Sequence, residues 1–166
     1  MHEMIKRRKD EGFTLIELMI VIAVIGILAV VLVPKVGTIK TQAKSAGIDT
    51  NIRMVQAYGQ SRITSWANAG TSVSTIEADF QSALTGGTDL MANPFSRSTT
   101  VIPDSVTPAQ PAVFTTTNVN YGTDGQTRPV LAGTVIIIPT SASSISIYGV
   151  DSAGKVMADK TITITP

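Results

Sequence analysis

Few residues of this 166-residue chain have the types and spacing that catalysis requires. His2 is the single histidine, so no histidine after residue 2 can activate a serine nucleophile. Cysteine is absent, which excludes a Cys–His pair and a thiolate metal site. It also lacks a P-loop and a Gly-rich nucleotide fingerprint. The sequence therefore predicts a protein that is not an enzyme and that has no catalytic residues and no cofactor.

Three aspartates near predicted turns, Asp124, Asp151 and Asp159, are the candidates for binding a cation. Carboxylates are calcium ligands in proteins. Aspartate is nevertheless common in turns for another reason, because its side chain bonds to the backbone two residues on. The turn role is favoured, and no metal site is expected.

The strongest chemical signal is Glu17, a single charge within the 21 residues from Phe13 to Val33. An apolar run of about 20 residues is long enough to cross a bilayer as a helix. A carboxylate there costs on the order of 3 kcal/mol near the bilayer centre, less near the headgroups, and the helix N-terminus offsets part of this cost. Glu17 is thus either an interfacial, dipole-stabilised residue or a charge that meets its partner inside an assembly.

Four basic residues, Lys6 to Lys9, precede this run and favour a cytoplasmic N-terminus. A cleaved secretory signal is disfavoured, because its apolar core is only about 7–15 residues and its small-residue cleavage site is missing here. A plain uncleaved anchor fits the length but does not explain Glu17. The formal net charge is +1, which argues against nucleic acid as an obligate partner.

The segment Gly12-Phe13-Thr14-Leu15-Ile16-Glu17-Leu18 follows the basic residues and opens the apolar run. It resembles the class III signal of the type IV pilins and of the pseudopilins of type II secretion systems. In that family a short basic leader ends in Gly, Phe often follows, and a Glu lies four residues beyond the Phe. All three elements are present.

The resemblance implies that a prepilin peptidase cuts between Gly12 and Phe13 and then methylates the new Phe13 amine. Glu17 would form an assembly salt bridge with the N-terminal amine of a neighbouring subunit. Mis-registered docking would leave that charge buried and unpaired, so Glu17 would set the register. The implied partners are identical subunits in a helical homopolymer, the peptidase, a pilus assembly platform and, before assembly, the cytoplasmic (inner) membrane.

Gly26 and Pro34 weaken the apolar helix at its middle and outer end. Related filaments can lose helicity here on assembly, so Gly26 to Pro34 is the expected flexible zone, although an intact helix in the monomer stays open.

Beyond Pro34 a stripe of apolar residues at helical spacing predicts that the helix continues to about Trp66, with Trp66 as a core anchor.

A short second helix is predicted by the capping-box spacing of Ser74-Thr75-Ile76-Glu77. It is expected to end at Gly86-Gly87, and its buried side is expected to hold Ile76, Phe80, Ala83 and Leu84. Four strands are then expected, with a hairpin turn at 151–154: 112–117, 129–138, 144–150 and 156–165.

The expected fold is α+β, a long N-terminal helix packed on a C-terminal antiparallel sheet of about four strands, which is the pilin lollipop. The expected parts are a cleaved basic leader (1–12), a transmembrane and filament-core helix (13–34), the amphipathic half of the helix (35–66), a variable loop region with a short helix (67–111) and the sheet (112–166). Without cysteine, the disulfide that closes many Gram-negative pilins is impossible.

The function expected from the resemblance is that of a pilin: a structural subunit that polymerises through its N-terminal helix into an extracellular filament on the cell surface. Before assembly it would be a single-pass membrane protein. The alternatives are a pseudopilin of a type II secretion or DNA-uptake system and a monomeric membrane-anchored surface module.

Overall fold

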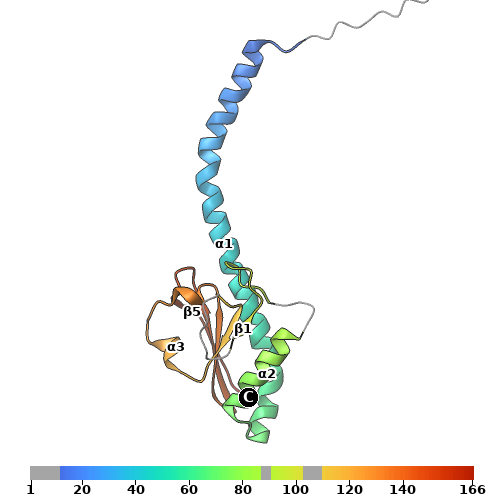
Figure 1. Ribbon diagram of the computed structural model, residues 1–166, viewed down its shortest axis with the longest axis vertical. Helices are drawn as coiled ribbons and strands as arrows, with labels where there is room; N and C mark the ends of the chain where they lie inside the picture. Colours follow the sequence, from blue (N-terminus) through green and yellow to red (C-terminus); the bar gives the residue numbers. More distant parts are fainter. Residues whose placement is uncertain (1–11, 87–90, 103–109) are drawn as a thin grey trace, which may run out of the picture. The chain divides into compact units, whose positions relative to one another are not determined.

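The computed structural model describes residues 12–86, 91–102 and 110–166 and shows an α+β fold, as expected (Figure 1). The chain forms two compact units, one up to Lys40 and one from Thr41 onward. Residues 1–11 of the leader, Gly87 and the stretch from Pro103 to Pro108 fall outside the described residues. So do the side chains of residues 33–36, which lie within a helix.

The first element, α1 (Leu15–Ala69), is a helix of 55 residues that continues through the boundary between the two units. The predicted helix, from Phe13 to about Trp66, matches it within three residues at each end. In the second unit α1 buries Ile52, Val55, Ile63 and Trp66 along one side. This is the stripe that apolar residues at intervals of three and four predict.

The second helix is α2 (Val73–Thr85), and its N-cap lies two residues before the predicted cap, Ser74. Its N-cap is Ser72, whose hydroxyl accepts a hydrogen bond from the backbone N–H of Thr75, and its C-cap is Gly86. Ile76 and Phe80 are buried as expected. Ala83 is exposed, against the prediction, because the side of α2 that packs is narrower than the apolar pattern.

The sheet has five strands in the order β1-β2-β3-β4-β5. The antiparallel part contains β3 (Val135–Ser141), β4 (Ser144–Val150) and β5 (Val156–Ile164). Two short strands, β1 (Val101–Ile102) and β2 (Val113–Thr115), extend it in parallel.

The predicted start of β3 at Pro129 is wrong. Pro129–Leu131 forms a short 3-10 helix, η1, and Gly133 with φ of 74° turns the chain into the strand.

Both faces of β3 are buried, which explains its unbroken apolar sequence. Val135 and Ile137 face the core that α1 and α2 build with the sheet. Ile136 and Ile138 belong to a smaller apolar cluster that Phe114, Leu131 and Val150 complete. The segment before β3, which carries a one-turn helix, α3 (Asn120–Thr123), contributes Tyr121 to the smaller cluster.

Candidate functional site

Gly12, Phe13 and Glu17, which the sequence singles out, lie at the start of α1, and Thr14 and Glu17 form a helix cap there. Thr14 is the last residue before α1, and Glu17 lies in its first turn. The backbone N–H of Thr14 donates to Oε2 of Glu17 at 2.9 Å, and the Thr14 hydroxyl donates to the same oxygen at 2.7 Å. The backbone N–H of Glu17 donates back to Thr14 Oγ1 at 3.3 Å.

This reciprocal pattern is a capping box, in which two side chains satisfy backbone donors that have no partner within the helix. Thr14 was not recognised as a functional residue from the sequence. The signal was present, because Thr-x-x-Glu just before an apolar run is the capping-box signature. The cap places the Glu17 carboxylate beside the backbone of residues 13 and 14, where cleavage before Phe13 would create a new amine.

Gly12 and Phe13, on either side of the expected cut, are exposed, Phe13 by 88%. Apart from Gly12 itself and its two chain neighbours, no residue has a heavy atom within 4 Å of the position that a Cβ on Gly12 would occupy. The peptide bond between them precedes α1, and the exposure of both residues leaves it accessible to an enzyme. The structure thus places Gly12, Phe13 and Glu17 within one short segment at the start of the helix.

The apolar side chains of α1 from Leu15 to Leu32 are exposed around the whole helix. This segment has a mean hydropathy of 3.1, is long enough to cross a membrane, and buries none of its residues inside the protein. A helix that is apolar all round requires an apolar environment supplied from outside, either lipid or other helices.

Gly26 and Pro34 both lie within the continuous span of α1. A Cβ on Gly26 would meet no other atom within 4 Å, so the helix surface is open there. The flexible zone from Gly26 to Pro34 stays a prediction.

The three candidate aspartates do not come together, and Asp159 lies within β5 rather than near a turn as predicted. Asp124 pairs with Arg128, while Oδ1 of Asp151 accepts hydrogen bonds from the backbone N–H groups of Ala153 and Lys155. Hydrogen bonds from Arg128, and then from the backbone of Gln126, lower the pKa of Asp124. Within the described ranges, no three His, Cys, Asp or Glu residues form a group that would hold a metal ion.

Two comparisons with known proteins find similarity. Residues 7–33 match the family model described as the prokaryotic N-terminal methylation motif. The chain is 42% identical, over 52 residues, to the type II secretion system core protein G of Pseudomonas aeruginosa. That similarity covers 31% of this chain and 37% of the relative, so the chain spans well under half of its length. No solved structure gives a significant match.

Proposed function

We propose that this chain, which belongs to the type IV pilin and pseudopilin family, is a structural subunit that polymerises through α1 into a type IV pilus. The observation that carries the proposal is the joint presence of an accessible Gly12–Phe13 bond, a capped Glu17 and an apolar helix exposed on every side. The match of residues 7–33 to the methylation motif supports the same processing step.

The proposed sequence of events starts with the chain anchored in the membrane by the segment Leu15–Leu32. A prepilin peptidase cuts before Phe13 and methylates the new amine, which removes the basic leader. Without it, the inner end of the helix carries no cluster of cations to hold it at the membrane surface. The helix then leaves the lipid and joins a bundle of identical helices, which cover its unburied apolar surface in place of lipid.

Glu17 has a defined role in this proposal. In a helix bundle the effective dielectric is lower than in water, so the attraction between a carboxylate and an amine a few ångströms away is stronger. Docking in another register would leave both charges unpaired at a high cost in free energy. Glu17 therefore selects one register between neighbouring helices. The subunit itself is proposed to have no catalytic activity and no cofactor.

A second candidate function is that of a pseudopilin in a type II secretion system, and the similarity to core protein G favours it. A pilin builds a long filament outside the cell, whereas a pseudopilin builds a short one within the cell envelope. Electron microscopy of cells that produce the protein at native levels separates the two.

Mass spectrometry of the chain isolated from its own cells tests the premise that both candidates share. The expected product begins at Phe13 and carries one N-methyl group. A chain that still contains residues 1–12 in mature assemblies would overturn both candidates.

A further inference from the structure

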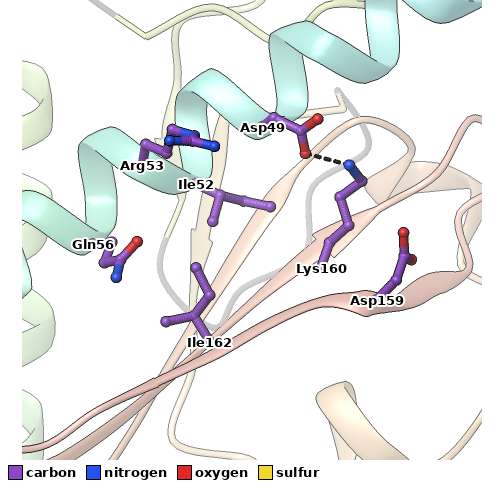
Figure 2. A pocket seen from close by; sticks show the side chains of 7 residues that line it. All are labelled: Asp49, Ile52, Arg53, Gln56, Asp159, Lys160 and Ile162. Carbon is purple, nitrogen blue, oxygen red and sulfur yellow. Dashed lines mark hydrogen bonds and ion pairs between the residues drawn. The ribbon is translucent and has the colours of Figure 1, made fainter.

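A charged groove lies in the second unit between α1 and β5, far along the chain from the processing site. Its volume is about 400 Å³. Figure 2 shows α1 as one wall and β5 as the other, with the Lys160 side chain of β5 reaching across to Asp49 on α1. The lining residues are Asp49, Ile52, Arg53, Gln56, Asp159, Lys160 and Ile162.

An irregularity in β5 creates the strand wall of this groove. Met157 pairs with Gly149 and Thr161 pairs with the preceding residue, Tyr148, so residues 158–160 have no counterpart in β4. A bulge of this kind re-aims side chains and interrupts the strand edge. It directs Lys160 to α1, where its Nζ donates to Oδ1 of Asp49 at 2.5 Å. The bulge and its charges also make the open edge of β5 unsuitable for adding another strand.

Two further charges in the groove have opposite signs and lie on opposite walls. Arg53 is exposed on α1 and Asp159 is exposed on β5. Among the residues that the structure describes, neither takes part in an ion pair. The groove therefore offers one cation and one anion to a molecule that enters it, in addition to its internal Asp49–Lys160 pair.

The same chain carries a surface with the complementary charges at the turn between β4 and β5. Asp151 and Lys155 lie at the two ends of this turn, and Lys155 is exposed. Ser152 and Ala153, at its tip, are exposed and small. Gly154, with φ of 88°, allows the tight turn, in which the backbone N–H of Asp151 donates to the carbonyl of Lys155 at 2.9 Å.

We propose that the groove between α1 and β5 is a contact site for a second copy of this chain, and that it receives the β4–β5 turn of that copy. Asp151 of the second copy would pair with Arg53, and its Lys155 with Asp159. Because the groove and the turn are different surfaces, the contact is heterologous, and repeating it generates an open helical polymer. The inference rests on the proposed filament function and names a lateral contact within the filament.

Carbodiimide cross-linking of filaments assembled from a mixture of ¹⁴N- and ¹⁵N-labelled subunits tests the proposal. The reagent converts a carboxylate to an O-acylisourea, the neutral amine of a neighbouring lysine attacks its acyl carbon, and an amide bond forms as the urea leaves. We expect an amide between Asp159 and Lys155 in peptides that combine the two isotopes. The internal Asp49–Lys160 pair gives same-isotope peptides and shows that the reagent has reached the groove.

Two variants of the groove provide a second readout, and a third variant outside the groove is the control. Each of the three changes the net charge by one unit. Arg53→Gln and Asp159→Asn each remove one ion pair, so we expect about two- to five-fold faster loss of subunits from filaments at low salt. Gln126→Lys, a charge change on an exposed residue outside the groove, should leave that rate unchanged. The Asp49–Lys160 cross-link confirms that each variant is folded.

The inference fails if filaments give the Asp49–Lys160 product but no mixed-isotope amide at Asp159, or if the two groove variants behave like Gln126→Lys. These results would leave the proposed function intact. The proposed function itself fails if the cleaved and methylated wild-type chain forms no filament at all. The two failures are therefore distinguishable.

Discussion

The indole Nε1 of Trp66 donates a hydrogen bond of 2.9 Å to Oδ2 of Asp79 and so joins the end of α1 to α2. Arg62 Nη2 donates to the same oxygen at 3.1 Å. Around this polar contact the rings of Tyr58, Trp66 and Phe80 pack with centroid separations of 5.2 to 6.2 Å. The junction between the two helices thus combines an aromatic cluster with one carboxylate that accepts two donors.

This junction predicts a pH-dependent contribution to stability. The Trp66 hydrogen bond and then the Arg62 hydrogen bond lower the pKa of Asp79 below its ordinary value of 3.8. The stabilising contribution is therefore fully present above about pH 4 and is lost as the pH falls through the lowered value. Asp79→Asn should reduce the free energy of unfolding by about 1 kcal/mol near pH 6 and by less below pH 4.

Urea unfolding of the full chain in detergent, followed by the fluorescence of its single tryptophan, measures this difference. Asp159→Asn serves as the matched control, because Asp159 is exposed and takes part in no ion pair within the described part of the chain. An Asp79→Asn effect of equal size at pH 3 and pH 6 would contradict the prediction.

A second prediction concerns Asn93, whose side chain is buried with all four of its hydrogen bonds made. Its Nδ2 donates to the carbonyls of Pro111 and Ala132, and its Oδ1 accepts from the backbone N–H groups of Phe95 and Ser96. Asn93→Ala leaves the two buried carbonyls and the two partly buried N–H groups without this partner, so we expect a loss of roughly 2–4 kcal/mol in unfolding free energy.

The same urea experiment checks this value against Asn118→Ala. The Oδ1 of Asn118 accepts one exposed backbone hydrogen bond, from Asn120, so its loss should cost less than about 1 kcal/mol. Equal effects of the two substitutions would show that the Asn93 network does not hold the segment 91–98 to the sheet.

Replacing Gly12 should block processing. Gly12→Val adds a branched side chain next to the bond to be cut and restricts the backbone there. We expect the chain to stay in the membrane with residues 1–12 attached and without a methyl group. Intact-mass spectrometry of membrane fractions detects this, and a methylated chain of mature mass would contradict it. Gly26→Ala, at an open position of α1, should be processed normally.

Replacing Glu17 should separate processing from assembly. Glu17→Gln retains the shape of the side chain and can still accept the Thr14 hydrogen bonds, but it has no charge. If the carboxylate pairs with a neighbouring amine, Glu17→Gln should be cleaved and methylated yet fail to form filaments, as should Glu17→Ala. Normal filaments from Glu17→Gln, seen by electron microscopy, would assign Glu17 to capping alone.

The helices were predictable because their signals are local. The apolar run and the stripe ending at Trp66 predict α1 to within three residues at either end. The start of α2 was placed two residues too late, because Ser72 and Ser74 are both suitable N-caps and only the bond between Ser72 and Thr75 distinguishes them. The turn at 151–154 was also correct, and Gly154 has the positive φ that it requires.

The sheet was predictable only in its antiparallel part, where alternation and a tight turn leave a pattern. The two-residue strand β1 has no periodicity to detect, and its parallel pairing with β2 depends on contacts between distant residues. The groove was not predictable either, because it needs the bulge at residues 158–160 and the approach of α1 to β5. Glu17 was predictable as a functional residue, because a charge within an apolar run is evident from the sequence alone.

The position of Ile48 to Trp66 in the core of the second unit has a mechanical consequence. In a filament under tension, the pull travels along α1 and acts on these side chains parallel to the helix axis. They are distributed over about five helical turns, so detaching the helix from the sheet requires all of their contacts to slide at once. A contact loaded in shear in this way resists force better than one that separates residue by residue. In the proposed filament, a subunit without disulfides would thus withstand traction through the length of one interlocked helix.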